Sequence, residues 1–321
     1  ISHRALILGA LSVGRTVVSG VSKGSDVQCT ATALRALGVD IEPLVEGKIL
    51  VNGLGIGGLR ESSRALDLGN SGTGARLLMG VCAQHNFKTV FIGDASLSSR
   101  PMHRVMAPLS DMGVQFEAGQ SGRLPLLMCG PQHLIPIEYE LPVPSAQVKS
   151  AILLAGLAAP GNTVVVEPEP TRNHTEHLLR HFGGKVSCVD DAAGKRIITL
   201  TGEAELRGAD VEVPGDPSQA AFVAVAALIT PGSDVVVENV CVNELRDGVF
   251  ATLMEMGADI EYFNQREVCG EPIADIRARH SGLTGVGVPV RRAPSMIDEY
   301  PILCVAAAFA EGRTTMRGLS E

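Results

Sequence analysis

Four helix-like segments along the chain each end at a glycine and lead into a short run of alternating apolar residues. The glycines are Gly38, Gly113, Gly183 and Gly257, which lie roughly 70 to 75 residues apart. A glycine after the last helical turn is typical of a left-handed helix cap, and an apolar period of two is typical of a strand. The pattern therefore predicts a repeated unit that contains both helices and strands.

A second pattern recurs in the same register, in which an Ala- and Leu-rich helix is followed by a turn and an apolar strand. The expected helices cover 3–12, 72–83, 147–158, 219–229 and 299–310, and the strands after them cover 16–21, 89–94, 163–168, 234–239 and 314–319. The chain is therefore expected to hold four full units and the opening of a fifth.

The starts of these five helices are rich in Ser, Asn, Gly, Asp and Thr, which suit N-caps and the turns before them. They read ISHR (1–4), GNSGTGAR (69–76), PSAQVKS (144–150), GDPSQAAF (215–222) and SMIDEYP (295–301). A helix N-terminus carries partial positive charge and unpaired N–H groups, which favour anions. Several starts also carry Arg, Gln or Lys, so converging starts would form an anion site.

Composition narrows the class of protein. Apolar residues make up 45% of the 321 residues and aromatics only 3%, which predicts a core of Val, Ile, Leu and Ala over roughly two domains. The formal charge of −8 argues against a nucleic-acid partner, because that binding needs clustered Lys and Arg. Seven scattered cysteines without C-x-x-C spacing predict reduced thiols in the cytoplasm, not a zinc or disulfide framework.

The two ends of the sequence and its hydropathy carry further expectations. No apolar stretch reaches the length of a membrane span, and no charged-then-apolar leader opens the chain, so no membrane partner is expected. The chain begins at Ile1 and stops at Glu321 without a tail, which indicates a piece of a longer protein. A Rossmann dehydrogenase is excluded, because no G-x-G-x-x-G follows the first predicted strand.

Six motifs in a fixed order resemble a known enzyme family. They are LDLGNSGTGARLL (66–78), GDASLSSRPM (93–102), PSAQVKSAILLAGL (144–157), EPEPTRNHTEHLL (167–179), VPGDPSQAAF (213–222) and APSMIDEYPIL (293–303). Over the whole sequence their order and spacing are similar to the 5-enolpyruvylshikimate-3-phosphate (EPSP) synthase family, in its bacterial class II form. The resemblance implies transfer of the enolpyruvyl group of phosphoenolpyruvate to the 5-hydroxyl of shikimate 3-phosphate, with release of phosphate, in aromatic amino acid biosynthesis.

The resemblance also implies an α/β fold of two similar domains, each an inside-out α/β barrel of three βαβαββ repeats, with the active site between them. On this basis residues 1–214 form a first domain of about three repeats without its N-terminal strand. Residues 215–321 form part of a second domain, about one and a half repeats. The family's D-K-S before I-S-H-R, and its later R-V-K-E-[ST]-D-R, D-D-H-R and final Lys, are absent from this sequence, so part of the catalytic set is expected outside it.

By resemblance, most of the family's site residues that occur in this sequence bind shikimate 3-phosphate. Its contacts fall on Arg4, Ser145, Ala146, Gln147, Thr171, Arg172 and Asp298. Asp298 matches the aspartate that accepts the proton from the 5-hydroxyl, and it is the one catalytic residue assigned. Without the family, Arg4 would be interpreted as a solvated charge at a helix start, Ser145 as an N-cap and Asp298 as an acidic helix cap.

Contacts to phosphoenolpyruvate fall by resemblance on Asn70, Gly72, Thr73, Arg100 and Gln147. Glycine at position 72 permits a close backbone approach that a side chain would block. Family members that tolerate glyphosate carry Ala at this place, so inhibition by glyphosate is expected here. Arg76 is expected to brace the loop, and Glu299 to be structural.

The remaining expectations concern cofactors, assembly and rival functions. No phosphoryl group is transferred, so neither a metal nor a cofactor is expected, and the family is usually monomeric. A sister enolpyruvyl transferase acts on UDP-N-acetylglucosamine but typically carries a Cys where this chain reads SLSSRPM (96–102), and RNA 3′-phosphate cyclase should have a more basic surface. An inactive fragment that only binds shikimate 3-phosphate is the alternative if the protein ends at Glu321.

Overall fold

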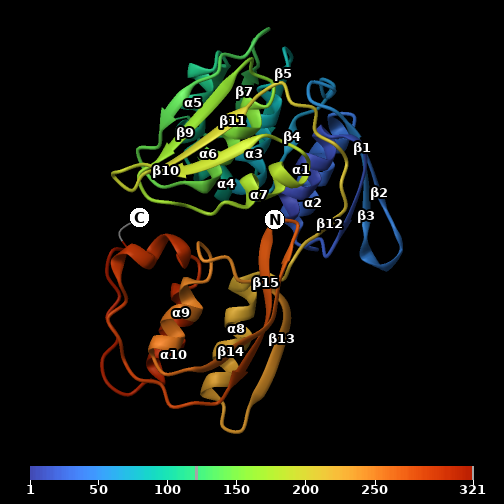
Figure 1. The fold of residues 1–321 in the computed structure, drawn as a ribbon. Coiled ribbons are helices and arrows are strands. Elements are labelled where there is room, and N and C mark those ends of the chain that lie inside the picture. Colours follow the sequence, from blue (N-terminus) through green and yellow to red (C-terminus); the bar gives the residue numbers. More distant parts are fainter. Residues whose placement is uncertain (120–121, 320–321) are drawn as a thin grey trace. The chain divides into compact units, whose positions relative to one another are not determined.

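The computed structural model describes residues 1–119 and 122–319, and the chain separates into two units, Ile1–Val213 and Pro214–Glu321 (Figure 1). Within these described residues, the first unit contains three four-stranded sheets and the second contains one three-stranded sheet. Each unit has its own buried apolar residues, mostly Leu, Ile, Val and Ala, as the composition predicts.

The three sheets of the first unit repeat one arrangement. Their orders are β12 (Val211–Glu212), β1 (Val13–Ser19), β3 (Ile49–Leu54), β2 (Asp40–Pro43); β4 (Leu66–Asp67), β5 (Lys88–Ile92), β7 (Leu126–Cys129), β6 (Gln115–Ala118); and β8 (Glu138–Glu140), β9 (Asn162–Glu167), β11 (Arg196–Thr201), β10 (Val186–Asp190). In each sheet a short edge strand pairs in parallel with a longer strand, and the other pairs are antiparallel. Because β12 pairs with β1, the end of this unit returns to its first sheet.

Several helices, some of them largely buried, accompany the three sheets of the first unit. They are α1 (Ser2–Leu11), α2 (Ser25–Ala36), α3 (Gly72–Cys82), α4 (Ala95–Ser99), α5 (His103–Asp111), α6 (Ala146–Gly156) and α7 (His174–His181), with a 3-10 turn η1 (Val45–Gly47). Every residue of α1 is buried. At Gly80 a Cβ would lie 2.3 Å from the carbonyl oxygen of Ala151, so α3 and α6 meet backbone to backbone. This close packing sets the two helix starts beside each other.

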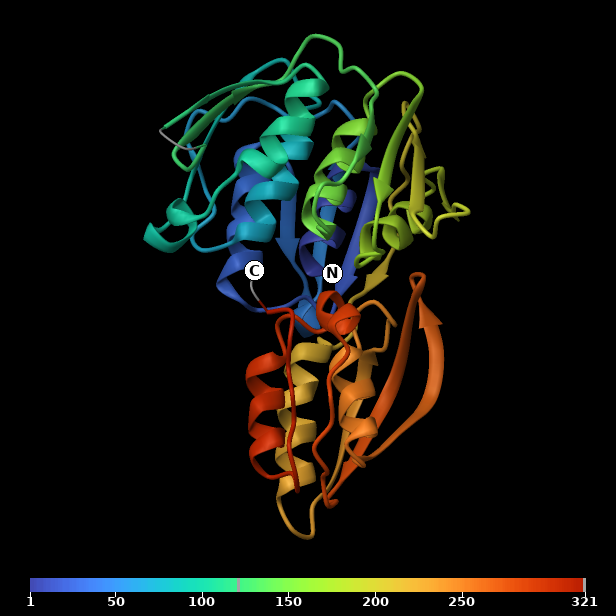
Figure 2. The ribbon, with the colours of Figure 1, turned by 90° about the vertical axis from the view of Figure 1, so that its left-hand side faces the viewer.

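The second unit packs three helices and one sheet. The sheet runs β13 (Asp234–Cys241), β15 (Glu271–Arg279), β14 (Asp259–Val268), all antiparallel. The helices are α8 (Pro217–Ile229), α9 (Gly248–Glu255) and α10 (Tyr300–Ala308), with a 3-10 segment η2 (Val290–Ser295) before α10. Figure 2 shows the helices lying alongside one another next to the sheet. Their apolar sides bury Phe250, Leu253 and Leu303.

The predicted helix–glycine–strand pattern is confirmed at all four positions. The glycines have φ values of 94° (Gly38), 100° (Gly113), 85° (Gly183) and 88° (Gly257), and each lies between a helix and a strand. The left-handed region is open to glycine because it lacks a Cβ. The five Ala- and Leu-rich helices also form, as α1, α3, α6, α8 and α10.

The strand expected at 314–319 is wrong within the described residues. Thr315 makes one parallel bridge with Gly287, and no ladder extends from it in the part of the chain the structure describes. Gly318 has φ 77°, which takes the backbone out of the extended region. The apolar alternation there was insufficient because a strand also needs a neighbour along its length.

Among the described residues, none of the helices has both the length and the hydropathy that a membrane span requires.

Candidate active site

The glycine-rich turn before α3 and the start of α6 lie side by side. Gln147 donates from Nε2 to Thr73 Oγ1 at 2.9 Å. Arg76 donates from Nη1 to Gln147 Oε1 at 2.7 Å and to the carbonyl oxygen of Gly72 at 3.3 Å. The structure therefore brings Gly72, Thr73 and Gln147 together, and Arg76 braces the turn as predicted.

Both helices at this place begin at a capping serine. Ser71 accepts a hydrogen bond from Gly74 N at 3.0 Å, and Ser145 accepts one from Val148 N at 3.4 Å. Asp216 caps α8 in the second unit in the same way, through Ser218 N at 2.9 Å. These caps agree with the prediction from the helix starts, and in the first unit they set two positive helix ends next to each other.

Arg100 lies across the same turn. Its Nη2 donates to Asn70 Oδ1 at 2.6 Å and to Ser96 Oγ at 3.3 Å. A Cβ on Gly72 would lie 2.9 Å from Arg76 Nη1 and 3.1 Å from Arg100 Nη1, so both guanidinium groups converge on this backbone. Burial lowers the pKa of Arg76, and repulsion from Arg100 adds to the shift. Two arginines and two helix starts make a local site for an anion in an acidic protein.

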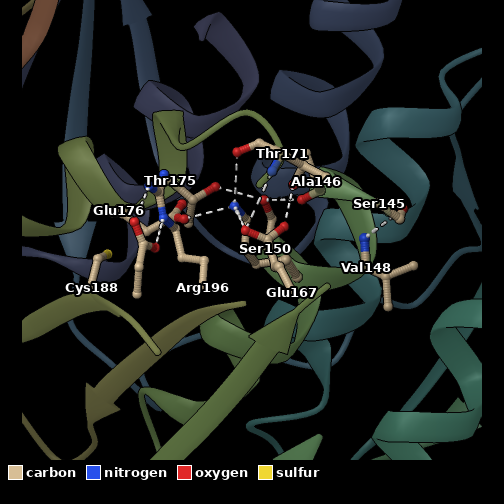
Figure 3. A network of polar contacts seen from close by, with 12 residues as sticks. Ser145, Ala146, Val148, Ser150, Glu167, Thr171, Thr175, Glu176, Cys188 and Arg196 are labelled. Carbon is tan, nitrogen blue, oxygen red and sulfur yellow. Dashed lines mark hydrogen bonds and ion pairs between the residues drawn. The ribbon is translucent and has the colours of Figure 1, made fainter. Parts of the chain in front are cut away.

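Arg4, on α1, contacts α6 and α7 and is only 8% exposed. It donates from Nε to Thr175 Oγ1 at 2.6 Å and from Nη2 to Ser150 Oγ at 3.0 Å. Ser150 in turn donates to the carbonyl oxygen of Ala146 at 2.6 Å (Figure 3). The interpretation of Arg4 as a solvated charge is therefore wrong, since its guanidinium is buried and links α1 to α6 and α7.

Lys149, on α6, is fully buried between two glutamates that are also fully buried. Its Nζ lies 2.9 Å from Glu167 Oε2 and 2.8 Å from Glu176 Oε1, and it donates to the carbonyl oxygen of Thr171 at 3.3 Å. The Thr171 hydroxyl donates to Glu167 Oε1 in a short hydrogen bond (Figure 3). Burial raises the pKa of Glu167, and Lys149 opposes that shift. The network ties the loop that carries Thr171 and Arg172 to the helix that begins at Ser145.

Sequence reasoning missed Lys149. It lies two residues after Gln147 in a helix that is otherwise apolar from Val148 to Gly156, apart from Ser150. A lone cation on an all-buried helix must be paired, because an isolated buried charge is strongly unfavourable. The sequence therefore indicates that Lys149 is paired with an anion, but it does not identify Glu167 and Glu176 as the partners.

Asp298 lies in the second unit, between η2 and α10, with its side chain 56% exposed. Arg246 Nη1 donates to Asp298 Oδ2 at 3.4 Å and to Glu299 Oε1 at 3.1 Å. Glu299 is fully buried and accepts a short hydrogen bond from the Ser218 hydroxyl. Burial raises the pKa of Glu299, while the Ser218 hydrogen bond and Arg246 oppose the shift. Glu299 is thus structural, as predicted, and Arg246 is a contact that the motifs did not reveal.

Asp247, which follows Arg246 at the start of α9, supplies a stability prediction. Burial raises its pKa to about 6, with repulsion from Glu244 contributing. A raised folded-state pKa means that its favourable contribution is complete below about pH 4 and is lost as the pH rises through about 6. Asp247→Asn is expected to raise the free energy of unfolding by about 1–2 kcal/mol at pH 8, after allowance for partial solvation, and to leave it unchanged at pH 4.

Urea denaturation of wild type and Asp247→Asn at the two pH values measures this difference. An equal gain at both pH values would contradict the prediction, because it would have a cause other than ionisation of Asp247.

The ten candidate residues of the first unit lie on segments that hydrogen bonds link to one another. In the turn before α3, Arg100 contacts Asn70, and Thr73, next to Gly72, contacts Gln147. Helix α6 carries Ala146, is capped by Ser145 and contacts Arg4. The Lys149 network adds the loop with Thr171 and Arg172. Asp298 lies in the second unit, where Arg246 donates a hydrogen bond to its carboxylate.

Known proteins resemble this chain over its whole length. The family model for EPSP synthase (3-phosphoshikimate 1-carboxyvinyltransferase) matches residues 1–321. The chain is 56% identical to the 3-phosphoshikimate 1-carboxyvinyltransferase of Parvibaculum lavamentivorans, with 100% of this chain and 71% of that protein aligned. It is 56% identical to the protein of the same name from Novosphingobium aromaticivorans, of which it covers 73%.

A solved structure confirms the predicted fold. The EPSP synthase from Acinetobacter baumannii superposes with a TM-score of 0.89 at 47% identity, over 100% of this chain and 72% of that one. The matches span both units, and four of the six motifs quoted from the sequence lie in the first unit, at 66–78, 93–102, 144–157 and 167–179. The chain therefore belongs to the EPSP synthase (3-phosphoshikimate 1-carboxyvinyltransferase) family.

Proposed function

We propose that the protein transfers the enolpyruvyl group of phosphoenolpyruvate to the 5-hydroxyl of shikimate 3-phosphate and releases phosphate. The observation that carries the proposal is the pair of guanidinium groups, Arg76 and Arg100, that converge on Gly72 beside Gln147. Both substrates are polyanions, and cations on adjacent helix starts suit them. The family match favours neither transfer to UDP-N-acetylglucosamine nor a fragment that only binds ligand.

The proposed roles follow the two substrates. Phosphoenolpyruvate is bound by Asn70, Gly72, Thr73, Arg100 and Gln147, and shikimate 3-phosphate by Arg4, Ser145, Ala146, Gln147, Thr171, Arg172 and Asp298. Asp298 takes the proton of the 5-hydroxyl as it attacks, a step that needs a carboxylate within hydrogen-bond reach. Positioning and electrostatic stabilisation supply the rest of the acceleration.

We further propose that residues 1–214 and 215–321 belong to the two domains of the enolpyruvyl transferase fold. The division of the chain near Val213 and the threefold sheet repeat in the first unit support this assignment. A monomer that works in the cytoplasm completes the proposal. Light scattering of the purified full-length protein tests the oligomeric state.

Phosphate release by the full-length protein tests the function. We expect release only when phosphoenolpyruvate and shikimate 3-phosphate are both present, and none when shikimate or UDP-N-acetylglucosamine replaces the phosphorylated acceptor. Phosphate release with UDP-N-acetylglucosamine instead would mean that the protein is an enolpyruvyl transferase that acts on UDP-N-acetylglucosamine. Saturable binding of shikimate 3-phosphate without any release would favour the binding-only alternative.

Glyphosate sensitivity is proposed to depend on the space at Gly72. In Gly72→Ala the new methyl group would press on Arg76 and Arg100 at 2.9 Å and 3.1 Å, so both guanidinium groups must move away from the turn. We expect KM for phosphoenolpyruvate to rise on the order of 10-fold, the equivalent of one weakened charge-assisted hydrogen bond. We also expect glyphosate inhibition to weaken more than that.

Steady-state kinetics with and without glyphosate measure the effect of Gly72→Ala. Gly119→Ala is the matched control, because a Cβ there would meet nothing within 4 Å in the same unit. Wild-type KM and inhibition in Gly72→Ala would show that the anion site lies elsewhere.

A further inference from the structure

Arg246 is a largely buried arginine of the second unit, and its guanidinium has four side-chain partners. It lies in the turn between β13 and α9, where its backbone N donates to the carbonyl oxygen of Asn243 at 2.7 Å. Its side chain is only 10% exposed. A buried guanidinium needs partners for its donors, and those partners lie on elements far away in the sequence.

The two ends of the guanidinium face two different elements. Nη2 donates to Ser218 Oγ at 2.6 Å and to Asp216 Oδ1 at 3.2 Å, both at the start of α8. Nη1 donates to Glu299 Oε1 at 3.1 Å and to Asp298 Oδ2 at 3.4 Å, both just before α10. Because the group is planar, fixing one end sets the direction of the donor at the other end.

Asp298 is the most exposed of the four partners. Its side chain is 56% exposed and that of Asp216 is 48% exposed, whereas Glu299 is fully buried and Ser218 bonds both Glu299 and Arg246. The contact to Asp298 is also the longest of the four, so it orients the carboxylate without immobilising it. Glu299 and Ser218 hold the guanidinium, and the guanidinium in turn restricts the exposed Asp298 carboxylate.

We propose that Arg246 is a positioning residue that aims the Asp298 carboxylate at the acceptor hydroxyl. The inference rests on the proposed function, in which Asp298 accepts the proton. A base that is misplaced by about 1 Å can lose on the order of 100-fold in rate. Arg246 therefore acts on the chemical step through Asp298 and makes no contact with substrate itself.

The test is a double-mutant cycle in the full-length protein with Arg246→Gln, Asp298→Asn and both together. We expect Arg246→Gln to lower kcat by about 10- to 100-fold while KM for shikimate 3-phosphate stays within about threefold. Arg246→Lys keeps the charge but not the fork, so it should restore only part of kcat. In the Asp298→Asn background, Arg246→Gln should lower kcat by less than about threefold, because the residue through which it acts is already removed.

Arg277→Gln is the matched control. Arg277 also pairs with a carboxylate in the second unit, through Nε to Asp234 Oδ1 at 2.8 Å, on the exposed sheet. We expect wild-type kcat for this variant. If Arg246→Gln does not fold, Arg246→Lys carries the same cycle.

The outcomes separate this inference from the function on which it rests. A full additional loss of about 10- to 100-fold from Arg246→Gln in the Asp298→Asn background would overturn the positioning role alone. A fully active Asp298→Asn variant would overturn both the base assignment and the inference. A loss confined to KM in Arg246→Gln would make Arg246 a binding residue, which also contradicts the proposal.

Discussion

Asp298→Asn is expected to lower kcat by about 100- to 10,000-fold while KM for shikimate 3-phosphate changes only a few-fold. Asparagine has nearly the same shape and keeps an oxygen that Arg246 can reach, but it cannot take a proton near neutral pH. The loss should therefore fall on the chemical step. Steady-state phosphate release at saturating substrates measures it.

Asp259→Asn is the control for Asp298→Asn. Asp259 is similarly exposed, at 47% against 56% for Asp298, and it also pairs with an arginine, Arg279, at 2.8 Å. We expect no change in kcat for this variant. Unchanged kcat with a raised KM in Asp298→Asn would mean that Asp298 binds the acceptor without removing its proton.

Lys149→Met is expected to lower the free energy of unfolding by about 3–5 kcal/mol. The substitution leaves Glu167 and Glu176 fully buried without their shared cation, and it removes the donor to the Thr171 carbonyl oxygen. An uncompensated buried charge costs more than the lost ion pair itself contributed. Urea denaturation at pH 7 measures the change.

Two further variants separate charge from packing at Lys149. Combining Lys149→Met with Glu167→Gln and Glu176→Gln removes all three charges and should recover much of the lost stability. Lys195→Met breaks an exposed pair with Glu140, at 2.7 Å, and should leave the denaturation midpoint nearly unchanged. Equal midpoints for Lys149→Met and Lys195→Met would contradict the account of the buried network.

The repeat could be predicted from sequence because each of its signals is local. A glycine after a helix and an apolar alternation depend on neighbouring residues, and all four left-handed glycines are where the pattern predicts them. The strand expected at 314–319 depended on a partner that lies elsewhere in the chain. Among the residues that the structure describes, Thr315 bridges only to Gly287, so the local pattern predicted a strand where a single bridge forms.

The ligand side of the candidate site followed from the family motifs, whereas the residues that hold it did not. Arg246 lies 52 residues before Asp298, and Lys149 lies 18 residues before Glu167, with no periodic relation between them. Their pairing arises from the way separate helices and loops pack. Arg4 is a similar case, since its burial depends on Thr175 and Ser150 on two other helices.

The fate of the bridging oxygen of phosphoenolpyruvate distinguishes enolpyruvyl transfer from phosphoryl transfer. The full-length protein is incubated with shikimate 3-phosphate and phosphoenolpyruvate that carries ¹⁸O between carbon and phosphorus, and the released phosphate is analysed by mass spectrometry. Enolpyruvyl transfer breaks the C–O bond, so the account predicts that the label leaves with phosphate and that the acceptor gains one enolpyruvyl group. Label retained in a three-carbon product, with phosphate unlabelled, would mean P–O cleavage and would contradict the account.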